Sequence, residues 1–344
     1  MRIHRSILRN RRAALTVGLI AAAGLVAASS VPAYAGASAP SRSVATSAAA
    51  TSASASAVTP DYAAAATSGK SVAGAVFGNA AVARAGNAAN DFRTTHQNMI
   101  ANLGHGSTAS PSATASASQL HDWWGTFPNA NSGAGGMATQ SVDPNFRLSD
   151  SSDVLYAPTA TPANNSCIEV VTVHTTSTPQ IWAWDWCKHI APEAEDNVNA
   201  SFVATYTTTV NGRTAYTEKN VQTNKSKNTW TAYLYNYTTN AWDTFYTSSG
   251  TDQSGLSYGW DMFEFYSSTN ASTGNTYVCG DIAAADLTLE SSSVEIDTAS
   301  GWSLANSSDS TWQPSASPNP TSYKCPDLLF NIVANNSDWT VSES

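Results

Sequence analysis

Two carboxylates fall opposite each other in a hairpin predicted near the middle of the chain. The runs 168–173 and 181–186 alternate apolar and polar side chains as strands do, and a turn centred on Ser177 joins them. Folded there, Glu169 faces Asp185. Two carboxyls that share a site push their pKa values apart, which gives the acid and base of a retaining glycoside hydrolase. A calcium ion between them, or two solvated side chains, are the alternatives.

The same predicted hairpin brings two cysteines together. Cys167 and Cys187 flank the two strands, and a cross-strand disulfide needs Cα atoms about 5.5 Å apart, which this register provides. By elimination, Cys279 pairs with Cys325. An even number of cysteines in an exported chain favours disulfides over zinc, because the chain has no C-x-x-C and no matching histidine spacing.

Three indoles line one face of the second strand of this hairpin. Trp182, Trp184 and Trp186 recur at every second residue, so they point the same way. Such a row is a platform on which sugar rings can stack. The alternative is that the row is buried as core, as large aromatic side chains usually are.

A further carboxylate lies in a strongly aromatic strand. Glu264 shares a predicted face with Trp260, Met262 and Tyr266. Among aromatic rings it would be either a general acid with a raised pKa or a structural carboxylate that accepts hydrogen bonds. The chain has no Gly-x-Ser-x-Gly elbow, phosphate-binding loop, dinucleotide fingerprint or H-E-x-x-H motif.

The elements that position these residues are strands. All 11 Trp lie at or after Trp123, and Thr, Val, Tyr and Trp alternate there between Asn, Gly and Ser turns. This predicts an all-β domain over 119–344, an antiparallel β-sandwich of the jelly-roll or concanavalin-like kind. Further hairpins are predicted between 202–210 and 214–221, at Asn211-Gly212, and between 230–235 and 242–247.

The first 118 residues are of a different kind. Residues 1–35 read as a signal peptide, with basic residues, an apolar stretch and a predicted cleavage before Gly36. Residues 36–118 are rich in Ala, Ser and Thr, which predicts disorder over most of them. Apolar residues at helical spacing predict a short helix over 90–103. It would be either a pro-segment that docks on the domain or a linker helix.

Charge and hydropathy limit the partners. Residues 119–344 carry 7 Lys and Arg against 23 Asp and Glu, a net charge of −16. Nucleic acid and anionic lipid need a basic face, so neither is expected as a partner. No second long apolar run follows the signal peptide, so we expect a secreted, extracellular protein without membrane association. Apart from a possible calcium ion, no cofactor is expected.

Three stretches resemble a group of secreted bacterial proteins that are commonly described as carbohydrate-binding. They are 230–236, 240–246 and 259–264. The resemblance covers roughly residues 140–340, and it implies a lectin-like, concanavalin-type sandwich whose partner is a polysaccharide or glycan.

A second similarity is to the glutamic peptidases, which are secreted acidic β-sandwiches made with a pro-segment. Those enzymes work with a Gln and Glu pair, and Gln180, Gln222 and Glu264 are the matching residue types here. The sequence therefore favours a secreted glycan-binding protein that acts at the cell envelope or on extracellular polysaccharide. The alternative is a hydrolase of the same fold, either a glycosidase using Glu169 and Asp185 or a glutamic-type peptidase using Glu264. An inert surface protein and a protease inhibitor stay open.

Overall fold

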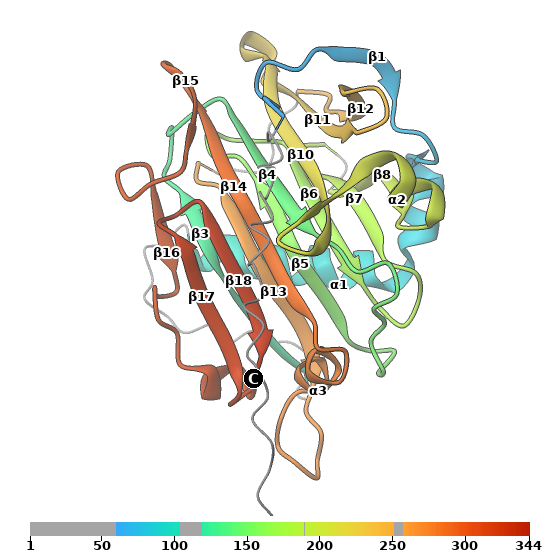
Figure 1. Cartoon of the computed structure of the whole chain (residues 1–344), viewed down its shortest axis with the longest axis vertical. Coiled ribbons are helices and arrows are strands. Elements are labelled where there is room, and N and C mark those ends of the chain that lie inside the picture. Colours follow the sequence, from blue (N-terminus) through green and yellow to red (C-terminus); the bar gives the residue numbers. More distant parts are fainter. Residues whose placement is uncertain (1–59, 104–118, 189, 251–256) are drawn as a thin grey trace, which may run out of the picture. The chain divides into compact units, whose positions relative to one another are not determined.

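Two β-sheets pack face to face in the computed structural model (Figure 1). It describes residues 60–103, 119–188, 190–250 and 257–344, with the backbone alone for 95–103. Neighbouring strands are antiparallel, except that β1 (Thr67–Ser71) runs parallel to β12 (Ala241–Thr247). The predicted antiparallel β-sandwich is therefore confirmed.

Each sheet mixes strands from distant parts of the chain. The ten-stranded sheet has the order β1, β12, β11 (Thr229–Asn236), β10 (Arg213–Asn224), β4 (Gly135–Ser141), β14 (Thr288–Thr298), β18 (Asp338–Glu343) and β17 (Leu328–Ala334), with β9 (Thr207–Val210) beside β10 and β15 (Gly301–Leu304) beside β14. The eight-stranded sheet has the order β16 (Ser310–Gln313), β3 (Gln119–Pro128), β13 (Trp260–Ser268), β5 (Val154–Thr161), β6 (Ile168–His174), β7 (Gln180–Asp185), β8 (Ala191–Asn197) and β2 (Val76–Phe77). The helical elements are α1 (Asn79–Leu103), α2 (Ala200–Tyr206), α3 (Tyr277–Ala284), η1 (Lys225–Lys227) and η2 (Pro320–Tyr323).

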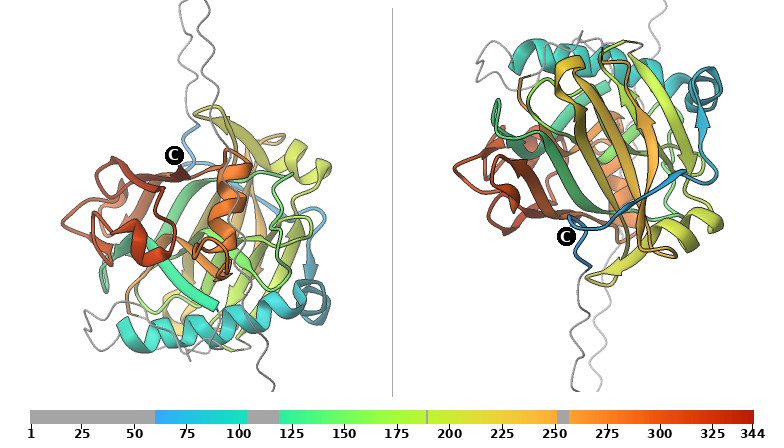
Figure 2. Two further views of the ribbon diagram at one scale, coloured as in Figure 1. Left: turned by 90° about the horizontal axis from the view of Figure 1, so that it is seen from below. Right: turned by 90° about the horizontal axis from the view of Figure 1, so that it is seen from above.

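The eight-stranded sheet is buried on both faces. The period of two sends Phe263 and Phe265 of β13 toward the other sheet, where they join a core with Trp339 of β18. Their neighbours Met262 and Tyr266 point the opposite way, into a second cluster. We call this second side the outer face of the eight-stranded sheet. Helix α1 runs across it (Figure 2).

Helix α1 belongs to a segment that we call the N-terminal strap, residues 60–103. In the strap, β1 adds to the edge of one sheet and β2 adds to the edge of the other. Tyr62 packs against Tyr235 and Trp242. The helix expected over 90–103 lies within the longer α1. The structure therefore extends the packed domain well ahead of residue 119, whereas the predicted signal peptide lies outside the described residues.

The hairpin of β6 and β7 forms, but its predicted register is wrong by one residue. Glu169 pairs with Trp184, and Asp185 pairs with Ile168. The Cys167–Cys187 disulfide is confirmed, with Cα atoms 4.9 Å apart, as is Cys279–Cys325.

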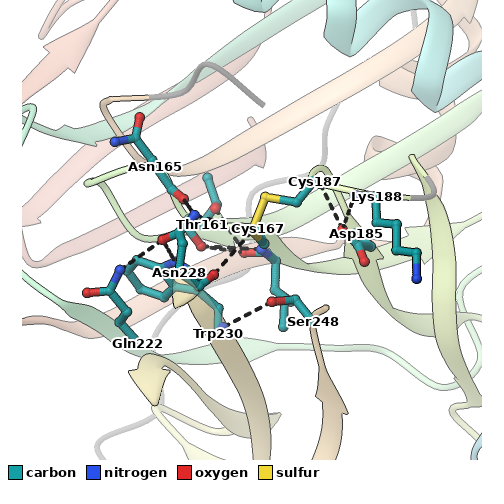
Figure 3. Close-up of a disulfide and its surroundings, with 12 residues drawn as sticks. Thr161, Asn165, Cys167, Asp185, Cys187, Lys188, Gln222, Asn228, Trp230 and Ser248 are labelled. Atoms are coloured by element: carbon teal, nitrogen blue, oxygen red, sulfur yellow. Dashed lines mark hydrogen bonds between the residues drawn. A yellow bond between two sulfur atoms is a disulfide. The ribbon is translucent and has the colours of Figure 1, made fainter. Parts of the chain in front are cut away.

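A turn at Asp185 reconciles the disulfide with the shifted register. Oδ1 of Asp185 accepts hydrogen bonds from the backbone N–H of Cys187 (2.7 Å) and of Lys188 (3.0 Å). The turn carries Cys187 back to Cys167, although the two are not a ladder pair (Figure 3). A disulfide between strand ends therefore fixes which strands meet, but not the exact register.

The other two hairpins form with one difference. Strands β11 and β12 pair as predicted, and β9 turns into β10 at Asn211 (φ 49°) and Gly212 (φ 80°). Residues 202–206 were predicted as strand but lie in helix α2. The side chain of Asn199 caps α2 by accepting from the N–H of Ser201 and Phe202, and this cap overrides the β propensity of the residues that follow.

Among the described residues, no helix is long and apolar enough to cross a membrane.

Candidate active site

A carboxylate and an imidazole meet on the outer face, on two neighbouring strands. His121 lies on β3 and Glu264 on β13, and their side chains are 2 % and 0 % exposed. Nε2 of His121 is 2.5 Å from Oε1 of Glu264, so the imidazole and the carboxyl group form a direct hydrogen bond. Such a pair is a candidate for general acid–base chemistry because it can take up and return a proton in a dry environment.

Trp123 and Tyr266 complete a square of four side chains with this pair. In the ladder, Glu264 is opposite Trp123 and Tyr266 is opposite His121. The ring of Tyr266 stacks on His121 with centroids 4.4 Å apart, which fixes the orientation of the imidazole. Nε1 of Trp123 and the hydroxyl of Tyr266 are buried and have no hydrogen-bond partner among the described residues.

Buried unpartnered donors are rare in native proteins and cost free energy. Next to a carboxylate, they would suit a substrate whose oxygen becomes negatively charged during the reaction. Burial, reinforced by the charge of Glu264, raises the pKa of Tyr266 far above its usual value. Its hydroxyl therefore keeps its proton and remains a donor.

A pocket of four aromatic rings adjoins this square. Tyr156, Trp182, Trp184 and Trp186 surround the ring of Phe92, which α1 inserts among them. We call these four residues the aromatic box. Tyr156 connects the two sites, because it is the ladder partner of Glu264 on β5. Its hydroxyl donates to the carbonyl of Ala88 in α1, at 2.8 Å.

The predicted indole row exists, but it is not open to solvent. Trp182, Trp184 and Trp186 share one face as predicted and are 0 %, 1 % and 2 % exposed. They are not part of the core between the two sheets. The strap covers them, so their role as a glycan platform stays a prediction.

Glu169 lies on the same face and is fully buried. It accepts hydrogen bonds from Nε1 of Trp186 (2.9 Å) and of Trp260 (2.7 Å), and from the hydroxyl of Thr159. These contacts are those of a carboxylate that orients two indoles.

The predicted acid pair of Glu169 and Asp185 is not formed. The one-residue shift sends Asp185 to the opposite side of the sheet, where Tyr246 donates to it across the sandwich at 2.9 Å. The paired-carboxylate site and the calcium site both required these groups on one face, so both lose their basis. Among the described residues no cysteine is free.

Neither glutamine singled out from the sequence reaches Glu264. Gln180 is in the same row of the outer face, but the order β13–β5–β6–β7 puts it three strands away, roughly 14 Å. Gln222 belongs to β10 in the other sheet. The group that does contact Glu264 is His121, which the sequence analysis did not single out. The alternation of His121 and Trp123 in 119–128 was its available signal.

No known family profile and no curated protein matches the sequence. Among solved structures, the fold is similar to scytalido-glutamic peptidase bound to a peptide-based transition-state analog, at 12 % identity and a TM-score of 0.38. It is also similar to SCP-B, a member of the eqolisin family of peptidases, in complex with the tripeptide Ala-Ile-His, at 11 % identity and a TM-score of 0.37. Each comparison covers 66 % of this chain and 100 % of the other. At this level of similarity, neither peptidase assigns an activity to the chain.

Proposed function

We propose that this protein is an exported hydrolase whose general acid–base group is Glu264, with His121 as its proton partner. The observation that carries the proposal is the buried contact of 2.5 Å between these two side chains, beside two unpartnered donors. Two disulfides fit a chain that folds outside the reducing cytoplasm.

The geometry favours attack on a carbonyl group. In that reaction Glu264 removes a proton from water, and the water oxygen bonds to the carbonyl carbon. The oxyanion that forms accepts hydrogen bonds from Tyr266 and Trp123. The bond to the leaving group then breaks, and the proton held by Glu264 moves to that group.

Cleavage of a glycosidic bond is the weaker alternative at this site. It requires two carboxyls about 5–9.5 Å apart. In the strand ladder Glu169 is two strands from Glu264 and displaced along them, so their Cα atoms are roughly 16 Å apart. Glu169 therefore does not supply the second carboxyl.

The strap makes the intact chain a precursor in this proposal. Helix α1 lies on the outer face that carries the candidate site, and residues 104–118, which follow it, are rich in Ser, Ala and Thr. A cut in that stretch would leave the strap held by non-covalent contacts alone.

The first prediction tests Glu264. Chain cut within 104–118 should hydrolyse peptides, and Glu264→Gln should lower the rate by about 10²–10⁴-fold, the usual contribution of a general base. The measurement is cleavage of a mixed peptide library, followed by mass spectrometry from pH 3 to pH 8. Glu295→Gln, at a half-buried residue of β14, is the matched control and should leave the rate unchanged. Full activity in Glu264→Gln would falsify the assignment, as would the absence of hydrolysis by the cut wild-type chain.

Glycan binding is the second candidate, and the row of three indoles favours it. Its test is glycan-array binding of the cut wild-type chain against Trp184→Ala. Equal signals from the two proteins would remove the row as a sugar platform.

A further inference from the structure

Phe92 is enclosed on several sides by the aromatic box. Its ring centroid is 4.7 Å from those of Tyr156 and Trp184, at angles of 67° and 63°. The ring of Trp182 meets it at 6.1 Å and 89°, and that of Trp186 at 5.8 Å and 33°. Three of these four contacts are edge-to-face, a geometry that is favourable for an aromatic guest. The box is therefore a pocket shaped around one bulky ring rather than a flat platform.

The box also contains a polar group that α1 does not satisfy. Nε1 of Trp184 is buried without a hydrogen-bond partner among the described residues. A helix uses most of its backbone carbonyls within itself, so it has few to offer. An extended polypeptide has carbonyls free along its whole length, and these could accept from Trp184, Trp123 and Tyr266. The unpartnered donors thus indicate an occupant other than a helix.

The box lies next to the candidate catalytic carboxylate. Tyr156 forms one wall of the box and is also the ladder neighbour of Glu264, so the two sites are about one strand spacing apart, roughly 5 Å. A polypeptide with a large side chain in the box would therefore bring its backbone close to Glu264.

We propose that the aromatic box binds a bulky aromatic or aliphatic side chain of a polypeptide substrate, and that Phe92 occupies it in the precursor as an internal stand-in. This inference rests on the hydrolase function proposed above and names its substrate class. Sugar rings fit the box less well, since they stack face to face on an open ring and this pocket encloses its guest edge-on.

The described contacts that hold α1 to the sheet are all non-covalent, and they include the hydrogen bond from Tyr156 to the carbonyl of Ala88. Arg84 forms an ion pair with Glu195 of β8 at 2.9 Å, and β2 adds two residues to the edge of the sheet. Gly86 interrupts the helix with a φ of 60°. The helical turn that carries Arg84 and the turn that carries Phe92 therefore contact the sheet as two separate segments. Ala85, Ala88 and Ala89 let the helix lie close to the sheet, but their side chains bury little area.

The test measures binding without chemistry, in the full chain. The double variant Phe92→Ala/Glu264→Gln has an empty box and no general base. Its tryptophan fluorescence is titrated with capped hexapeptides that carry Phe, Leu or Ala at the third position. We expect the Phe and Leu peptides to bind about tenfold or more tightly than the Ala peptide, as burial of one large apolar side chain implies. Glu264→Gln alone, with Phe92 in place, should bind all three at least tenfold more weakly.

Each outcome separates the inference from the hydrolase proposal. Equal affinity for the three peptides overturns the inference, whether or not the cut wild-type chain cleaves peptides. Selective binding of the Phe and Leu peptides supports the box, even if no variant hydrolyses anything, and in that case only the hydrolase proposal falls. Tighter binding of cello- or chito-oligosaccharides than of the Phe peptide also overturns the inference.

A second variant covers the case in which Phe92→Ala fails to fold. Arg84→Gln in the Glu264→Gln background leaves the box filled but removes the ion pair to β8. The same titration should show a several-fold gain in affinity for the Phe peptide over Glu264→Gln alone, since α1 detaches more easily. No gain for the Phe peptide, or an equal gain for the Ala peptide, contradicts the role of Phe92.

Discussion

Some hydrogen-bond donors on the outer face have a partner, whereas others have none among the described residues. Glu169 accepts from three donors at once, and these fix the indoles of Trp186 and Trp260. The unpartnered nitrogens of Trp123 and Trp184 lie on the same face. Glu169 therefore has a structural role on this face, because it holds two indoles in place. The nitrogens of Trp123 and Trp184 are instead the atoms that a ligand would contact.

The prediction at this scale concerns Glu169. Glu169→Gln replaces an oxygen that accepts hydrogen bonds with an amide that donates, so at least one buried N–H loses its partner. We expect the free energy of unfolding to fall by about 2–3 kcal/mol, since hydrogen bonds to charged groups contribute this much. Chemical denaturation measures it, and Glu295→Gln serves as control. A change within 0.5 kcal/mol would show that these contacts contribute little.

Among the elements, the β6–β7 hairpin and helix α1 build the box together. The hairpin contributes the indole row, and its Cys167–Cys187 disulfide closes a loop with a sequence separation of 20. Cys279–Cys325 closes a longer loop, with a separation of 46. A disulfide stabilises chiefly by restricting the unfolded chain, so the longer loop should contribute more.

The prediction for these elements compares the two disulfides. Replacing Cys167 and Cys187 together by Ser should lower the free energy of unfolding by about 3 kcal/mol, and replacing Cys279 and Cys325 by about 4 kcal/mol, according to loop length. Denaturant titration of both double variants gives the two values. If loss of the Cys167–Cys187 disulfide lowered the free energy of unfolding more than loss of Cys279–Cys325, packing around the hairpin would contribute more than chain entropy.

The whole molecule buries several carboxyl groups whose pKa values are raised. Burial raises the pKa of Asp122 to about 8, of Asp261 to about 6, and of Glu195 and Asp196 to about 7. The folded state therefore holds protons that the unfolded chain releases. Burial also lowers the pKa of His174 to about 3, which acts in the opposite direction below the usual pKa of histidine.

The prediction for the molecule is a stability that rises toward acidic pH. A raised carboxyl pKa contributes stability below the unfolded value near 4 and loses it as pH rises through 6 to 8. His174 opposes this trend below about pH 6.5, but at least six carboxyl groups with raised pKa values act in the other direction. The melting temperature should therefore be higher at pH 5 than at pH 8, as measured by calorimetry. Asp122→Asn should make the melting temperature depend less on pH near pH 8. A melting temperature that rises from pH 5 to pH 8 would contradict the proposed effect of the raised carboxyl pKa values.

Much of the architecture follows from local patterns in the sequence. Alternation predicts the strands β6, β7, β11 and β12, because side chains on a strand point to opposite faces with a period of two. The same period separates Glu264 from its neighbours Phe263 and Phe265. The symmetric positions of Cys167 and Cys187 about the hairpin turn predict the first disulfide, since sulfur atoms must come within bonding distance, and elimination gives the second.

Only the tertiary structure decided which groups meet. The turn at Asp185 shifts the ladder by one residue and so separates Asp185 from Glu169, because a period of two converts any single-residue slip into a change of face. The contact of His121 with Glu264 joins residues 143 positions apart, and no local pattern encodes such a distance. The strap that brings Phe92 to the box is likewise a product of packing between distant segments, which sequence periodicity does not describe.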